Sequence, residues 1–113
     1  MIYNKTSNGC VYLIADYTNE VYKIGVSRNC TSKRMKQLQT GNSNELTLLY
    51  THKTEYPYRL ETILHNRFKI KQIHNEWFAL DNEDVKNFDK TCEEIDKTIQ
   101  IMKDNPFFSK NLH

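Results

Sequence analysis

The chain of 113 residues is short of cysteine and has neither a signal peptide nor an apolar run of membrane-spanning length. Its three cysteines, Cys10, Cys30 and Cys92, are odd in number and show no Cys-x-x-Cys spacing, so the sequence predicts free thiols rather than a disulfide framework or a zinc site. The missing leader and apolar run predict an intracellular protein without a membrane partner, cytoplasmic, or nuclear if the host is eukaryotic. Without repeats or low-complexity tracts, residues 1–113 are expected to form one domain.

The net charge of +2 is also small, but it hides an uneven distribution. Residues 1–79 carry eleven Lys and Arg against six Asp and Glu, a net charge of +5. Residues 80–113 carry five against eight, a net charge of −3. A basic body followed by an acidic C-terminal element permits a nucleic-acid partner for the body. A solvated charged surface has the same composition, so charge alone does not decide between the two.

Residues 9–25 are the segment around which the chain is organised. Two runs rich in β-branched and aromatic residues, near 10–16 and 20–26, flank the turn-forming stretch 16–19. This pattern predicts a β-hairpin.

The register of this hairpin has two alternatives. With an even number of loop residues, Tyr12 lies opposite Gly25 and shares its face with Lys23, and the glycine leaves room for a substrate backbone. With an odd number, Tyr22 takes the place of Lys23 beside Tyr12, because a shift by one residue turns every side chain to the other face. Either register sets a second polar group beside the phenol.

A short helix and a third strand are expected next. Thr31 or Ser32 can cap a helix that runs to about Gln39, with Arg34 half-shielded on its surface. Residues 45–52 predict the strand, because the apolar side chains at positions 46, 48 and 50 share one face.

A second helix is predicted to begin at Pro57, which suits a first helical position. Its apolar residues span an arc of roughly 140°: Leu60, Ile63, Leu64 and Phe68. Glu61 falls just outside this arc, and His65 lies one turn further along the same flank. The imidazole has three interpretations: a partner of Glu61, a direct participant in chemistry, or a plain surface histidine.

The C-terminal segment, residues 81–104, predicts the longest helix, with Asp81 as its N-cap. Its apolar residues alternate spacings of three and four: Val85, Phe88, Cys92, Ile95, Ile99 and Met102. This stripe is expected to pack on the sheet, and a homodimer through the same helix is the alternative.

Taken in order, these residues resemble the GIY-YIG nuclease superfamily, and most closely its phage- and virus-type branch with a YKIG second motif. The matching stretches are Val-Tyr-Leu-Ile at 11–14, Tyr-Lys-Ile-Gly at 22–25, Arg34 with Leu38, Leu60-Glu61 with Leu64-His65 and Phe68, and Asn-Glu-Trp-Phe at 75–78. The resemblance covers about residues 9–80, so the acidic helix of 81–104 lies outside it.

The resemblance implies an α/β (α+β) fold: a small central three-stranded antiparallel sheet flanked by helices, here with an extra C-terminal helix. It also implies phosphodiester hydrolysis with one Mg²⁺ or Mn²⁺ ion. In this family pattern Glu61 holds the metal and Arg34 clamps the non-bridging phosphate oxygens. Tyr12 orients or deprotonates the water. The implied catalytic set is Tyr12, Lys23, Arg34, Glu61 and His65, with Tyr22 and Gly25 in support.

The chain departs from the family pattern at three places. The family's second tyrosine falls eleven residues after the first, where this chain has Lys23, and Tyr22 stands one place early. Leu38 occupies a position where many members carry His or Tyr. The segment before Arg34 is one residue longer than is typical, so Lys33 is the alternative phosphate-binding residue.

The function predicted from the sequence is a metal-dependent endonuclease that hydrolyses nucleic acid, double-stranded DNA in preference to RNA. The residues expected to bind the nucleic acid are Arg28, Lys33, Lys36, Arg67, Lys69 and Lys71. Two other functions are open: a nucleic-acid-binding module without catalysis, and a protein-interaction domain that recruits its partner through the C-terminal helix.

Overall fold

The computed structural model describes residues 8–40 and 46–104. In chain order its elements are β1 (Gly9–Asp16), β2 (Val21–Ser27), α1 (Ser32–Thr40), β3 (Leu46–Thr54), α2 (Pro57–Arg67), the 3-10 helix η1 (Lys69–Lys71), β4 (Gln72–His74), β5 (Trp77–Phe78), α3 (Asn82–Lys86) and α4 (Phe88–Asp104). Within these described ranges, no helix has both the length and the apolar character that a membrane span requires.

One antiparallel sheet with the order β3-β1-β2-β5-β4 runs through the molecule. The predicted fold class is confirmed, but the sheet has five strands instead of three. Residues 72–78, for which no strand was predicted, add β4 and β5. Their two-residue turn holds Asn75 at φ 49°, a left-handed conformation that asparagine tolerates better than most residues.

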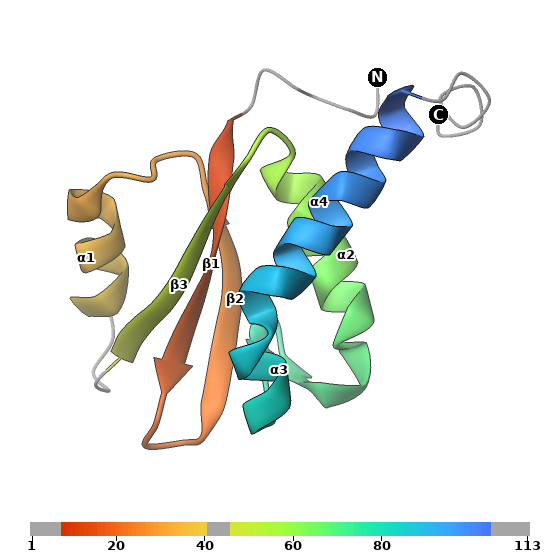
Figure 1. Ribbon diagram of the computed structural model, residues 1–113. Helices are drawn as coiled ribbons and strands as arrows, with labels where there is room; N and C mark the ends of the chain where they lie inside the picture. Colours follow the sequence, from red (N-terminus) through yellow and green to blue (C-terminus); the bar gives the residue numbers. More distant parts are fainter. Residues whose placement is uncertain (1–7, 41–45, 105–113) are drawn as a thin grey trace.

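Helices cover the sheet unequally, as Figure 1 shows: α1 lies alone over one face, and α2, α3 and α4 lie over the other. The hydrophobic core fills the second side, where alternate residues of β1 and β2 meet the apolar stripes of α2 and α4. Its fully buried members include Val11, Leu13, Ile24, Leu60, Leu64, Phe78, Phe88 and Cys92. The face below α1 is therefore the one on which polar side chains of the central strands can remain accessible.

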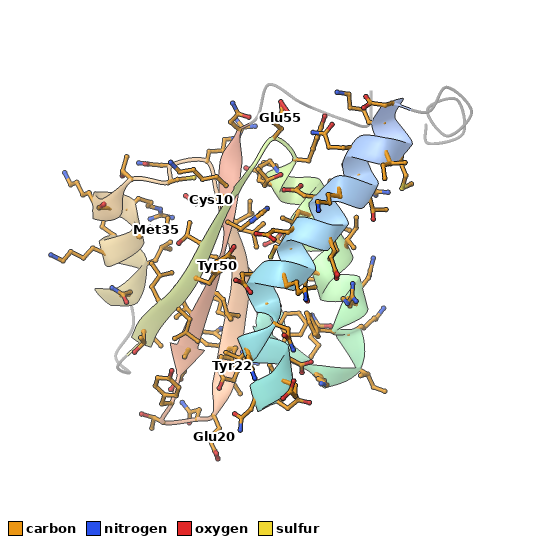
Figure 2. All side chains as sticks on the ribbon, viewed as in Figure 1. Cys10, Glu20, Tyr22, Met35, Tyr50 and Glu55 are labelled. Atoms are coloured by element: carbon orange, nitrogen blue, oxygen red, sulfur yellow. The ribbon has the colours of Figure 1, made fainter. Side chains whose placement is uncertain are left out.

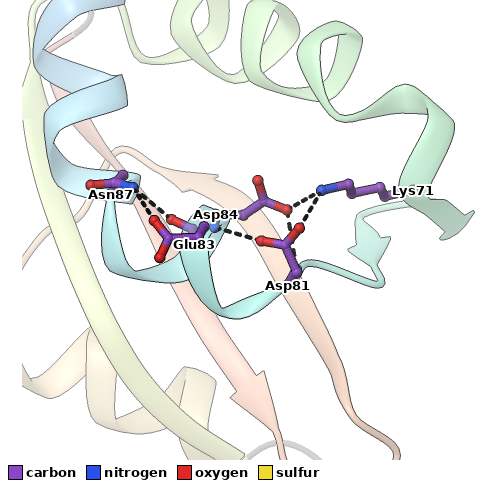
Figure 3. Close-up of polar contacts among 5 residues, drawn as sticks. All are labelled: Lys71, Asp81, Glu83, Asp84 and Asn87. Atoms are coloured by element: carbon purple, nitrogen blue, oxygen red, sulfur yellow. Dashed lines mark hydrogen bonds and ion pairs between the residues drawn. The ribbon is translucent and has the colours of Figure 1, made fainter.

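The C-terminal segment forms two helices, not the single one predicted. Asp81 caps α3 as expected, in a reciprocal capping box with Asp84 (Figure 3). The helical run is interrupted at Asn87, whose backbone and side-chain N–H groups both donate to the carbonyl of Glu83. A side chain that bonds the preceding turn in this way competes with regular helix continuation.

The predicted apolar stripe of α4 packs inside the chain. Phe88, Cys92, Ile95 and Ile99 are all buried in the same core as α2 and the sheet. Sheet packing, the first of the two expectations for this stripe, is thus confirmed. A homodimer through this helix stays a prediction, and it would have to use side chains outside the stripe.

Candidate active site

The hairpin has the even-loop register. Tyr12 pairs with Gly25, and the four-residue loop between the strands is braced by Asp16, whose carboxylate accepts from the backbone and side-chain N–H groups of Asn19. Lys23 therefore lies on the same face as Tyr12. Tyr22 faces the other way and packs against the core, next to α3 (Figure 2). The structure thus separates Tyr22 from the phenol that it was expected to support.

Gly25 makes space for the ring of Tyr12. A Cβ atom at residue 25 would lie 2.3 Å from the phenol oxygen and 2.4 Å from Cζ, far inside ordinary contact distance. The ring thus lies directly over the glycine, and the Tyr12 side chain is only 4% exposed. The space that the sequence suggested for a substrate backbone is filled by the chain's own tyrosine.

Several charged side chains act on the Tyr12 hydroxyl. Burial is the largest cause that raises the pKa of this phenol, to about 12; the negative charges of Glu76 and Glu61 act in the same direction, and the guanidinium of Arg34 opposes them. At neutral pH the residue is consequently a protonated phenol. It can donate one hydrogen bond and accept others, but it is not a ready-made base.

Arg34 reaches this site from α1. Of the two predicted caps, Thr31 is the one that caps the helix, by accepting a hydrogen bond of 3.3 Å from the backbone N–H of Arg34. Arg34 is the basic side chain of α1 whose charge acts on the phenol. Lys33, the alternative, instead lines a groove between α1 and β3. The two candidates for phosphate binding therefore face different surroundings.

Glu61 and His65 approach the site from α2. His65 donates its Nε2–H to the carbonyl of Ile24 at 3.0 Å, and its ring packs edge-on against Phe78 at a centroid distance of 4.9 Å. The same nitrogen lies 3.9 Å from a Glu61 oxygen, at the limit of an ion pair. The imidazole is thus fixed against β2.

The half-buried Glu61 carboxylate lies near both positively and negatively charged side chains. Burial raises its pKa most, and Glu76 raises it too, whereas His65 and Lys23 lower it. Lys23 therefore contributes a positive charge to the environment of Glu61. The interpretation of His65 as a neighbour of Glu61 agrees with this arrangement.

Glu76 is a residue of this site that the sequence reasoning did not select. It lies in the turn before β5, and its carbonyl accepts a 3.0 Å hydrogen bond from the backbone N–H of Ile24. Its charge acts on both Tyr12 and Glu61. The available signal was the stretch 75–78, where a carboxylate precedes the aromatic pair Trp-Phe, but only pairing of β5 with β2 brings it here.

The donors at this site suit a magnesium-like ion. Within residues 8–40 and 46–104, no group of three or more His, Cys, Asp or Glu side chains could hold a metal. Mg²⁺ does not require such a cage, because it commonly binds through one or two carboxylates, with water and substrate phosphate completing its shell. Glu61, half-buried and close to the charge of Glu76, is an oxygen donor that a cation would neutralise.

The residues expected to bind nucleic acid are spread over the surface. Arg28 lies over the Tyr58 ring, 5.7 Å from its centroid, and Arg67 and Lys69 are exposed. Lys71 instead forms ion pairs with Asp81 at 3.1 Å and with Asp84 (Figure 3). Its charge is compensated by α3, and these contacts do not support its assignment to a nucleic-acid surface.

Comparison with known proteins identifies one family. The T5orf172 domain model matches residues 9–99. This match continues into α4, past residue 80, where the sequence resemblance ends. No curated protein and no solved structure matches the chain.

Proposed function

Because the chain belongs to the T5orf172 domain family, which is found in phage-type endonuclease-like proteins, we propose that it is a metal-dependent endonuclease with a GIY-YIG-type active site. The observation that carries the proposal is the Tyr12 phenol seated over Gly25, where the charges of Arg34, Glu61 and Glu76 act on its hydroxyl. A strand tyrosine with a purely structural role needs none of these neighbours.

Each side chain has a role that phosphodiester hydrolysis requires. Arg34 presents a planar guanidinium that can bind two non-bridging phosphate oxygens at once. A divalent cation, Mg²⁺ or Mn²⁺, when bound at Glu61, supplies positive charge for the phosphate and acidifies a coordinated water. Lys23 adds a fixed positive charge beside Glu61, which favours the ionised carboxylate. Double-stranded DNA is the proposed substrate.

Tyr12 is assigned to orientation of the attacking water. Since burial raises the pKa of this phenol to about 12, its proton stays in place at neutral pH. The hydroxyl can donate to the phosphate or water while its lone pairs accept from the water. Of the two roles that the resemblance allowed, orientation and deprotonation, the first fits this environment.

The test is digestion of a supercoiled plasmid by the wild-type protein in Mg²⁺ and in EDTA. We expect metal-dependent nicking, and Glu61→Gln should reduce the rate by at least about a thousandfold, because the amide has nearly the same volume but cannot neutralise a cation. Glu55→Gln is the matched control on the loop before α2, outside this site, and should nick normally. Nicking by Glu61→Gln at the wild-type rate would refute the site.

The non-catalytic binding module gives a different result in the same experiment. It would retard the plasmid in a salt-dependent manner and leave it intact in Mg²⁺ and in Mn²⁺. A protein-interaction domain would neither bind nor cut it.

A further inference from the structure

A basic groove lies between α1 and β3, on the same face of the sheet as Tyr12. Its volume is about 820 Å³. The residues that line it are Cys30, Ser32, Lys33, Met35, Lys36, Gln39, Leu48, Thr51 and Lys53. Three of these described residues are lysines and none is acidic. Among the described residues of the wall, the charge is therefore of a single sign.

The register of the sheet connects this groove to the candidate active site. Thr51, in the groove wall, lies directly opposite Tyr12 on β1, and Lys53 lies opposite Cys10. The hydroxyl of Thr51 contacts the Met35 sulfur at 3.8 Å, so α1 rests on β3 at this point. Figure 2 shows Met35 on the side of α1 that faces the sheet.

The two flanks of α1 carry different basic residues. Arg34 and Lys36 are separated by about 200° around the helix axis, because each residue adds about 100°. With Met35 between them against the sheet, they project from opposite flanks. The charge of Arg34 reaches Tyr12, whereas Lys36 lines the groove. The helix thus presents a cation on the side of the active site and a cluster of cations on the other side.

The second large cleft lacks this character. It has a volume of about 880 Å³ and lies between the end of β3 and α4. Its wall includes Glu55 and Asp96 as well as Arg28 and Lys97, and it shares Lys53 with the α1–β3 groove. Asp96 is also committed to internal contacts, accepting from Thr54 at 2.7 Å and pairing with His52 at 2.6 Å. A polyanion would meet mixed charges there, so the α1–β3 groove is the better match.

We propose that the α1–β3 groove binds the sugar–phosphate backbone of a nucleic acid at a position away from the scissile phosphate. The proposal rests on the nucleic-acid substrate proposed above, but not on cleavage. Three ammonium groups attract consecutive phosphates as point charges without reading the bases. The partly exposed apolar side chain of Leu48 in the groove wall suits a deoxyribose ring. The groove therefore contributes to the affinity for the nucleic acid and to its position on the protein, but it gives no sequence preference.

The experiment measures binding without catalysis. Fluorescence anisotropy with a labelled 30-base-pair duplex in EDTA gives Kd at several salt concentrations. The groove variant is Lys33→Gln/Lys36→Gln/Lys53→Gln. Its control is Lys86→Gln/Lys90→Gln/Lys97→Gln, which removes the same charge from exposed positions of α3 and α4 beyond the other face of the sheet.

Each phosphate contact contributes about 0.9 to the slope of log K against log salt, so the groove variant should lose between about 2 and 3 from that slope. Its affinity at moderate salt should fall about tenfold or more, while the control keeps the wild-type slope. The single variant Lys33→Gln should lose about 1, and it provides the same test if the triple variant fails to fold.

An unchanged slope in the groove variants, or an equal loss in the control, overturns the proposal. Failure of the nuclease proposal has a different signature. In that case wild-type protein binds the duplex with the predicted salt slope but leaves plasmid intact in Mg²⁺.

Discussion

Replacing Gly25 by alanine should displace the Tyr12 phenol, which we propose is catalytic, because the new methyl group would lie 2.3 Å from the Tyr12 oxygen and 2.4 Å from Cζ. Ordinary contact begins near 3.4 Å, so the ring has to move by about 1 Å or more. The glycine itself does not have positive φ, which means that alanine strains no backbone angle at this position. The whole effect therefore comes from the clash.

The size of the effect follows from two opposing terms. Overpacking a well-filled site typically costs about 1–3 kcal/mol. Alanine also restricts the unfolded chain and returns about 0.4–1 kcal/mol. The net loss should be about 1–2 kcal/mol, or about 5–10 °C in Tm for a domain of this size. A displacement of about 1 Å at a reacting centre should lower the nicking rate by about a hundredfold.

A double-mutant cycle with Tyr12→Val isolates the clash. Valine, like tyrosine, favours strands, but it has no ring over residue 25. In this background Gly25→Ala should be neutral or slightly stabilising, as judged by urea unfolding. Gly9→Ala is the control: its Cβ would lie 2.7 Å from the backbone oxygen of Ser27, so it should destabilise both backgrounds equally. Equal destabilisation by Gly25→Ala in the two backgrounds, or full nicking activity of Gly25→Ala, would refute the argument.

Three further predictions test the neighbouring side chains. Arg34→Lys should lower the nicking rate by about a hundredfold or more, because an ammonium cannot form the two parallel hydrogen bonds of a guanidinium. Lys33→Ala should stay within a few-fold of the wild-type rate. The reverse order of the two effects would move the phosphate-binding role to Lys33. Lys23→Ala should strongly lower the nicking rate, while Tyr22→Phe, on the core side of the sheet, should leave it nearly unchanged. Lys23→Arg should keep part of the rate if the lysine acts as a fixed positive charge. Burial raises the pKa of Glu61 above its ordinary value of 4.5, so the ionised carboxylate destabilises the folded state. Glu61→Gln should therefore have a higher Tm than the wild-type protein at pH 7. The difference should disappear below about pH 4.5, where the carboxyl is protonated in both states, and a gain that persists there would contradict the assignment.

Features that depend on near neighbours in the chain were predicted from the sequence. The hairpin, the cap at Thr31, the start of α2 at Pro57 and the cap at Asp81 are all confirmed. Each follows from contacts between residues at most four positions apart, or from the two-residue period of a strand. The same period offered two registers, and the loop geometry selected the one that sets Lys23 on the Tyr12 face.

Other features were decided only by the tertiary structure, since they join segments that the sequence keeps far apart. Strands β4 and β5 are very short, and they exist because β5 pairs with the edge of β2, a contact that local patterns do not encode. That pairing brings Glu76 to the phenol of Tyr12, 64 positions earlier in the chain. The position of the Tyr12 ring over Gly25 likewise depends on the pairing register of β1 and β2, which brings the two residues into contact. The residue types are written in the sequence, but which charges act on one another depends on distances that only the folded chain sets.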